Sequence, residues 1–198
     1  MGPEGQSDDR ATLPAQGGDA QRTGSPPCFR VTATSPENTQ NIGSILGRLL
    51  RPGDLILLRG PLGAGKTCLA QGVVRGFGLR ARVTSPSFTL ANVYENPETR
   101  SCLYHLDLWR IKSAPEALGI GLDEYLEGPG PCIIEWPEIA TSVLPNEHLQ
   151  IRFTVHADAR ELEICGFGQR HRALLEKLRE RLHHKGYKVE EETSAARD

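Results

Sequence analysis

Along the middle of this chain, segments with the apolar spacing of β-strands alternate with segments that have the apolar spacing of α-helices. Short apolar or alternating runs predict strands near residues 29–33, 55–58, 89–94, 102–108, 131–135, 149–155 and 162–164. Apolar residues spaced three and four apart predict helices after Ser35, after Gly65 and over residues 174–182. Ser113 and Glu116 fit a capping box at the start of a further short helix. Such alternation predicts an α/β fold, a three-layer domain with a mixed, largely parallel central sheet.

The two ends of the chain lack this pattern. Residues 1–27 are rich in Gly, Pro, Ser, Asp and Gln, and they cannot bury enough apolar surface to offset the entropy lost on ordering. We therefore expect a disordered extension over 1–27, one domain over 28–186, and a flexible tail over 187–198 that contains a run of three glutamates.

A phosphate-binding motif follows the apolar run at 55–58. Gly60, four further residues, and then Gly65, Lys66 and Thr67 fit G-x-x-x-x-G-K-[ST] at every fixed position. Glycines let backbone N–H groups turn toward a phosphate, the lysine supplies a positive charge, and the threonine hydroxyl can ligate Mg²⁺. The setting of strand, glycine-rich loop and helix predicts that the chain binds a nucleoside triphosphate.

Composition narrows the function classes. The chain has 198 residues, with 23 basic and 25 acidic side chains and a formal net charge of −2. This balance gives no sign of a DNA-binding protein, and no apolar run is long enough to predict a membrane partner. The five cysteines are scattered and lack C-x-x-C spacing, which argues against a disulfide framework or a zinc site and favours the reducing cytoplasm.

Two acidic residues are candidates for the carboxylate that an Mg²⁺ site needs. Glu135 closes the apolar run at 131–135, and Asp107 lies in the run at 102–108, on the same strand face as His105. The alternative for Asp107 is a turn-forming role, and for Glu135 a salt bridge at a strand end. Spacing does not decide which of the two contacts the metal.

Ser85 and Ser87 lie on the connection after the predicted phosphate-loop helix. In phosphate-loop enzymes this region often forms a switch whose hydroxyls sense the metal or the γ-phosphate. The alternative is a Ser-Pro turn with local hydrogen bonds.

Two other classes of protein, small-molecule kinases and GTP-driven switches, also contain this phosphate-binding loop. A small-molecule kinase needs an acceptor site and usually an arginine-bearing lid, and no Arg-rich lid segment follows Glu135. A GTP-driven switch would need an Asn-Lys-x-Asp motif for guanine and an Asp-x-x-Gly motif, and the sequence has neither. Both rank below an ATPase.

Four motifs, taken in order and spacing, resemble the bacterial TsaE (YjeE-type) ATPases over about residues 31–164. They are Gly60–Thr67, Ser85–Thr89, His105–Arg110 and Ile133–Glu138. The resemblance implies a small Mg²⁺-dependent ATPase that hydrolyses ATP in the synthesis of threonylcarbamoyladenosine in tRNA. It also implies TsaB and TsaD homologues as partners, with tRNA reached only indirectly, through the complex.

The resemblance also assigns roles to residues. It implies catalytic roles for Lys66, Asp107 and Glu135, metal contacts for Thr67, Glu135 and Asp107, and a switch at Ser85 and Ser87. The implied nucleotide contacts are Pro61, Leu62, Gly63, Ala64, Gly65, Lys66 and Thr67, with Pro36 and Arg160 toward the nucleoside.

Three positions depart from the usual family pattern. Pro61 stands where Asp is usual, Ser87 where Thr is common, and Trp109 where Tyr is usual. The first removes a carboxylate from the loop, the second keeps the hydroxyl, and the third loses a phenol. None removes the expected chemistry.

Overall fold

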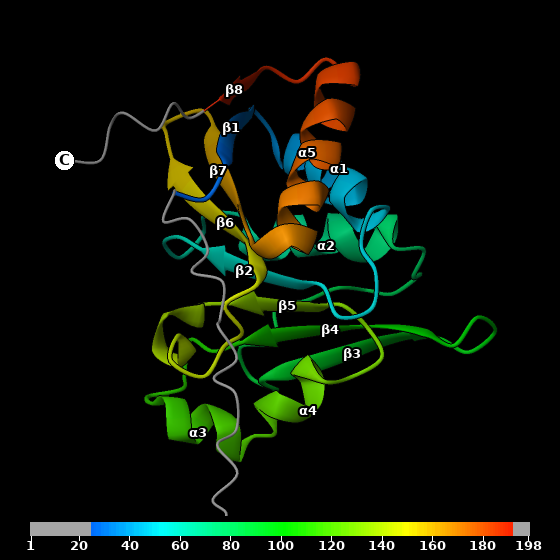
Figure 1. Cartoon of the computed structure of the whole chain (residues 1–198), viewed down its shortest axis with the longest axis vertical. Coiled ribbons are helices and arrows are strands. Elements are labelled where there is room, and N and C mark those ends of the chain that lie inside the picture. Colours follow the sequence, from blue (N-terminus) through cyan, green and yellow to red (C-terminus); the bar gives the residue numbers. More distant parts are fainter. Residues whose placement is uncertain (1–24, 192–198) are drawn as a thin grey trace, which may run out of the picture.

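A computed structural model describes residues 25–191 (Figure 1). The elements in chain order are β1 (Cys28–Ala33), α1 (Pro36–Gly47), β2 (Leu55–Arg59), α2 (Lys66–Gly76), β3 (Ala91–Asn96), β4 (Ser101–Asp107), α3 (Ala114–Gly119), α4 (Leu122–Leu126), β5 (Cys132–Glu135), the 3₁₀ helix η1 (Pro137–Ala140), β6 (His148–Val155), β7 (Arg160–Phe167), α5 (Gly168–His184) and β8 (Val189–Glu191). The extension predicted over 1–27 lies outside the described residues as far as residue 24, and so does the predicted tail from residue 192 onward.

The strands form a single mixed sheet of order β3-β4-β5-β2-β6-β7-β1-β8. Parallel pairing joins the four adjacent strands β4, β5, β2 and β6, whereas the hairpins β3–β4 and β6–β7 and the pairings of β1 with β7 and β8 are antiparallel. The predicted α/β fold with a mixed sheet is confirmed, and three of the seven strand pairings are parallel. The phosphate-binding motif therefore begins at the carboxyl end of a central strand, the usual place for ligands in open α/β sheets.

Helices cover both faces of the sheet, as the three-layer prediction requires. Successive residues of β2 alternate between two apolar clusters: Ile56 and Leu58 pack with α1, α2 and α5, while Leu55 and Leu57 pack with α3, α4 and η1. Figure 1 shows α1, α2 and α5 gathered together, with α3 and α4 near β3 and β4. The continuous apolar run of β2 follows from its burial on both faces.

Helices α1 and α2 touch backbone to backbone through small residues. A Cβ placed on Gly72 would lie 2.0 Å from the carbonyl oxygen of Gln40, and one on Gly76 would lie 2.1 Å from that of Ser44. Gly43 and Gly47 make equally close approaches from α1. This packing fixes the helix that carries Lys66 at its first position. The helix predicted after Ser35 is also confirmed, and Ser35 is its N-cap, since Ser35 Oγ accepts from the N–H of Asn38 at 3.1 Å.

A buried ionic contact joins the start of α5 to the start of β2. Asp54, only 2% exposed, accepts hydrogen bonds from Arg170 Nε at 2.8 Å and Nη2 at 2.6 Å, and from the N–H of Arg51 at 2.7 Å. His171 Nε2 accepts from the N–H of Leu55 at 3.3 Å, which requires a neutral imidazole. Burial lowers the pKa of His171, against the opposing effect of Asp54.

The structure corrects the predicted start of the flexible tail at residue 187. Residues Val189–Glu191 form β8, which pairs antiparallel with β1, and Tyr187 and Val189 pack against the core. The sequence did not predict this strand because Glu190 and Glu191 are exposed on the edge of the sheet, where a strand does not need apolar residues.

The cysteine prediction is also corrected. Cys28 and Cys165 form a disulfide between β1 and β7, with their Cα atoms 4.2 Å apart. The two residues are 137 positions apart in sequence and are placed directly opposite each other by the register of the two strands. Their spacing along the chain carries no signal of this pairing.

Two further elements, α4 and η1, were not predicted, since each is too short to show a hydrophobic period. Over residues 25–191, none of the helices combines the length and apolarity needed to cross a bilayer.

Candidate functional site

The phosphate-binding loop runs from the end of β2 to the start of α2. Gly60, Gly63 and Gly65 have φ values of 140°, 74° and 105°, a region that L-residues with side chains rarely occupy. At Gly60 a Cβ would also lie 2.8 Å from Cβ of Phe153 on β6. The motif glycines are thus required by the backbone path as well as by the ligand that such a loop cradles.

Lys66 is buried beneath this loop, with 4% of its surface exposed. Its Nζ donates to the carbonyl oxygens of Gly60 at 2.8 Å and Pro61 at 2.9 Å. Burial lowers the pKa of the ammonium, and the nearby carboxylates of Glu135, Asp107 and Glu138 oppose this effect. The lysine is a positive charge held in place at the phosphate loop and close to the acidic side of the site.

Trp136 covers the same ammonium. Its ring centroid lies 3.8 Å from Lys66 Nζ, a cation–π geometry. The ring also packs against that of the half-exposed Trp109, with the two ring centroids 4.3 Å apart. The backbone of Trp136 has φ of 58°, unfavourable for a bulky residue. The strained turn directly after β5 therefore aims the indole at the lysine.

Glu135 is the carboxylate that meets the phosphate-loop threonine. Its Oε1 accepts from Thr67 Oγ1 at 2.9 Å and lies 2.9 Å from His105 Nε2. The glutamate and the histidine are both buried, at 3% and 0% exposure. This contact lets His105 orient Glu135 from the neighbouring strand β4.

The paired oxygens of Thr67 and Glu135 suit Mg²⁺. This ion takes oxygen ligands at about 2.1 Å in octahedral geometry, which places adjacent ligands about 3 Å apart. Within the described part of the chain, no group of three or more His, Cys, Asp or Glu side chains converges on a metal position. One hydroxyl and one carboxylate, completed by water and substrate phosphates, is a donor set typical of Mg²⁺ in nucleotide sites.

Asp107 lies beside Glu135 but has different partners. The register of β4 and β5 pairs the two residues. Asp107 Oδ2 accepts from the hydroxyls of Ser85, at 2.9 Å, and Ser87, and the two hydroxyls are 2.7 Å from each other. Its Oδ1 accepts from the N–H of Trp109 at 2.9 Å, as in the turn-forming alternative. The aspartate thus ties the connection before β3 to the end of β4.

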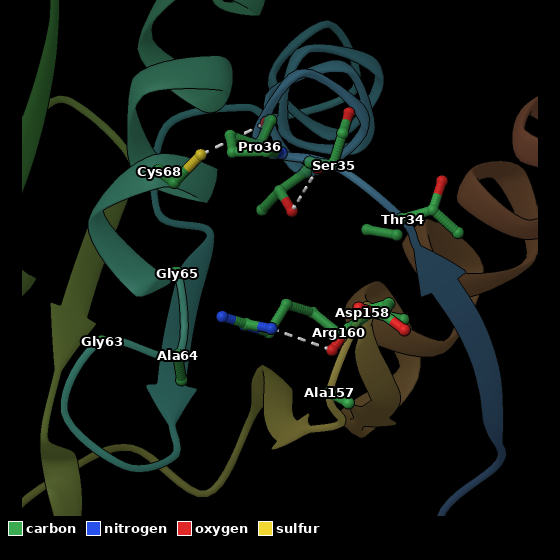
Figure 2. A pocket seen from close by; sticks show the side chains of 13 residues that line it. Thr34, Ser35, Pro36, Gly63, Ala64, Gly65, Cys68, Ala157, Asp158 and Arg160 are labelled. Carbon is green, nitrogen blue, oxygen red and sulfur yellow. Dashed lines mark hydrogen bonds between the residues drawn. The ribbon is translucent and has the colours of Figure 1, made fainter.

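Two cavities meet at the phosphate loop. One, of about 380 Å³, is lined by Lys66, Thr67, Ser85, Ser87, Asp107 and Glu135 together with both tryptophans and residues 62–65 and 68. The other, of about 360 Å³, is bounded by Pro36 and the start of α1, by the 157–160 turn with Arg160, and again by Gly63–Gly65. Figure 2 shows the Arg160 side chain extending across this second cavity toward Gly65.

The predicted site residues are therefore brought together from six segments of the chain. Pro61 is the exception among the loop residues, since it lines neither cavity and contributes only its carbonyl to Lys66. The carbonyl of Arg160's neighbour Ala159 accepts from the Arg160 guanidinium at 3.0 Å, which holds this side chain over the second cavity.

Several residues that contribute to the site, among them His105, Thr39 and Asp158, had no role assigned from the sequence. His105 contacts and orients Glu135. Its position two residues before Asp107, on the same strand face, was the feature of the sequence that could have pointed to it. Thr39 and Asp158 line the second cavity. Neither could be found from sequence, because only the fold brings the β6–β7 turn next to α1.

Comparison with known proteins now decides the family. The family model described as "Threonylcarbamoyl adenosine biosynthesis protein TsaE" matches residues 33–162. The chain belongs to the TsaE family. The match spans all four motifs and the residues that line both cavities, whereas Cys28, α5 and β8 lie outside it.

Relatives of known name agree with this assignment. The tRNA threonylcarbamoyladenosine biosynthesis protein TsaE of Treponema pallidum (strain Nichols) is 40% identical over 138 residues, 69% of this chain and 100% of that protein. The protein of the same name from Bacillus subtilis (strain 168) is 38% identical over 145 residues, 73% of this chain and 89% of that protein. The crystal structure of Bacillus subtilis YdiB superposes with a TM-score of 0.67 at 33% identity, covering 78% of this chain and 95% of that chain.

Proposed function

We propose that this TsaE-family protein is a Mg²⁺-dependent ATPase that takes part in threonylcarbamoyladenosine modification of tRNA. The observation that carries the proposal is the contact of Thr67 with Glu135 at 2.9 Å, beside Lys66 and in the first of two cavities that share the loop residues 63–65. One cavity has the charged groups that a triphosphate and its metal require, and the other has the size and the mixed lining that a nucleoside requires.

Lys66 and the loop amides bind the phosphates in this proposal. The ammonium and the start of α2 both present positive charge to the β- and γ-phosphates. Thr67 and Glu135 would hold Mg²⁺, and the bound ion would supply neutralisation of the charge that develops on the phosphate oxygens during hydrolysis. Pro36 and Arg160 contact the nucleoside. The burial of Lys66 strengthens its attraction for the phosphates because the surrounding dielectric is low.

Asp107 has a different role from Glu135 in the same proposal. Ser85 and Ser87 donate to Asp107, and a γ-phosphate near them would compete for those hydroxyl protons. Nucleotide binding then alters the contacts of the 85–87 switch, and Asp107 is left as an acceptor near the attacking water. This assigns Asp107 to the positioning and activation of water, and Glu135 to the metal.

The partners proposed are homologues of TsaB and TsaD, with tRNA reached through their complex. The names of the relatives support the pathway. The exposed apolar side chains of Leu62 and Trp109, which line the first cavity, and of Phe88 in a third motif support a protein partner beside the site. We place this work in the cytoplasm, where the Cys28–Cys165 bond would be open to reduction.

ATP turnover, measured as phosphate release with and without TsaB and TsaD homologues, tests the proposal. We expect slow turnover that rises with the partners and requires Mg²⁺, and at least a hundredfold loss, about 3 kcal/mol, in Lys66→Ala. Lys177→Ala removes an exposed lysine of α5 and is the matched control. Undiminished turnover in Lys66→Ala would refute an ATPase at this loop.

Glu135→Gln separates binding from hydrolysis. The amide keeps the size of the side chain and an oxygen, but it loses the charge that a divalent cation needs. We expect turnover to fall strongly while binding of ATP without metal persists. Equal turnover in Glu135→Gln and wild type would remove Glu135 from the metal site.

A further inference from the structure

One stretch of the chain has a charge distribution unlike the rest. Residues 55–94 contain no Asp or Glu, although they include Arg59, Lys66, Arg75, Arg80 and Arg82. The whole chain has a net charge of −2, so its other segments are acidic on balance. A local positive potential can therefore exist on this protein despite its overall charge.

Three of these arginines gather at one groove. A cavity of about 650 Å³ lies where the end of α2 and residues 79–83 meet α1, and Arg75, Arg80 and Arg82 line it with Gln40 and Gln71. All three arginines are exposed. The groove is separate from the two cavities at the phosphate loop, with which it shares no lining residue.

The guanidinium groups at this groove lack carboxylate partners. In the part of the chain that the structure describes, Arg80 and Arg82 make no hydrogen bond or ion pair, and Arg75 makes one long contact, 3.4 Å to Asn41 Oδ1. By contrast, Arg59, Arg152 and Arg170 each pair with a carboxylate. The groove therefore presents free donors that match the oxygens of an anion.

The floor of the groove is ordered by two glutamines. Gln40 Nε2 donates to Gln71 Oε1 at 2.9 Å, and Gln71 Nε2 donates to the carbonyl oxygen of Val83 at 3.1 Å. This chain of hydrogen bonds, with the buried side chains of Leu79 and Val83, fixes the path of residues 79–83. The arginines thus project from a shaped backbone that leads directly to Ser85.

We propose that this arginine groove binds the phosphodiester backbone of structured RNA. Bidentate guanidinium–phosphate contacts are the main source of sequence-independent affinity for nucleic acid. No aromatic side chain lines the groove, so stacking on unpaired bases, the usual mode for single strands, is not available there. The proposal rests on the proposed function in tRNA modification, to which it adds direct contact with the tRNA.

An acidic protein surface is the competing occupant, and the composition of the groove favours RNA. Protein interfaces have an apolar or aromatic centre. The exposed large apolar residues of the described chain, such as Leu62, Phe88 and Trp109, lie elsewhere, while the large apolar residues of the groove, Leu79 and Val83, are buried.

Fluorescence anisotropy with a labelled, unmodified tRNA transcript tests the proposal in the absence of ATP. The variants are Arg80→Ala/Arg82→Ala and, as a charge-matched control, Arg172→Ala/Arg181→Ala on exposed positions of α5. We expect wild type to bind with an affinity that falls with salt. The groove variant should bind about tenfold to a hundredfold more weakly at about 0.1 M salt, with a log–log salt slope reduced by about 2. The control should lose much less.

Three results would overturn the proposal: no binding of the transcript by wild type at low salt, equal losses in the groove and control variants, or displacement of the transcript by polyglutamate at matched charge. ATP turnover of the wild-type protein, measured without RNA, reports the proposed function independently. Turnover without RNA binding would reject the groove proposal alone, and RNA binding without turnover would reject the ATPase alone.

Discussion

The direct backbone contact between α1 and α2 makes Gly72→Ala a sharp test of the packing that supports the phosphate loop. Gly72 lies in the interior of α2, where alanine is otherwise the better helix former by about 1 kcal/mol. Intrinsic propensity therefore predicts a more stable protein. The structure predicts the opposite.

The magnitude follows from the contact distances. The added Cβ would lie 2.0 Å from the Gln40 carbonyl oxygen and 2.8 Å from the carbonyl carbon, and Cβ contacts under 3.0 Å are essentially never seen. Both groups belong to helix backbones, so no rotamer change relieves the clash and the helices must separate by about 1 Å. Overpacking of this kind typically costs about 1–3 kcal/mol, or more when backbone must move. Set against the gain in propensity, we expect a net loss of about 1–2 kcal/mol.

Urea unfolding followed by circular dichroism measures this difference. Gly119→Ala is the control, since Gly119 ends α3 and a Cβ added there would have nothing within 4 Å, so this variant should gain up to about 0.5 kcal/mol. The two alanine variants should thus move the unfolding midpoint in opposite directions. If Gly72→Ala is as stable as wild type or more so, the close approach of α1 and α2 is wrong.

Three further predictions concern other parts of the molecule. Burial lowers the pKa of His171 below its ordinary 6.5, so as the pH falls the unfolded chain binds a proton at this residue before the folded chain does. The neutral histidine therefore contributes its full stability above pH 6.5, and this contribution is lost as the pH falls below 6.5. The free energy of unfolding should decline below about pH 6.5 more steeply in wild type than in His171→Gln, and parallel pH profiles would contradict this. Reducing the Cys28–Cys165 bond should lower that free energy by roughly 2–4 kcal/mol, whereas Cys28→Ser should not respond to reductant; equal wild-type stability with and without reductant would argue against the bond. Arg160→Ala should raise KM for ATP about tenfold with little change in kcat, and an unchanged KM would exclude Arg160 from the nucleoside contact.

The parts of the site that are contiguous in sequence were predictable. Gly60 to Thr67 form a loop whose conformation depends on local glycines, and the apolar run before it indicates a strand buried on both faces. Glu135 could be chosen as a candidate because a carboxylate at the end of an apolar strand has few structural reasons to be there. The TsaE resemblance then supplied the roles, and the family is confirmed.

The remaining features depend on register between distant strands. Sequence left Asp107 and Glu135 equal as partners of the metal, and only the pairing of β4, β5 and β2 shows that Thr67 contacts Glu135 while Asp107 contacts the serines. The Cys28–Cys165 bond was missed for the same reason, because a one-residue change of register would separate the two sulfurs.

Titration calorimetry of Mg·ATP into the folded protein tests the central claim most directly. The account predicts saturable binding of one nucleotide per chain by wild type, weakened by chelation of Mg²⁺ and lost in Lys66→Ala, whose fold is checked by circular dichroism. The absence of binding by well-folded wild type, or equal binding by wild type and Lys66→Ala, would contradict it.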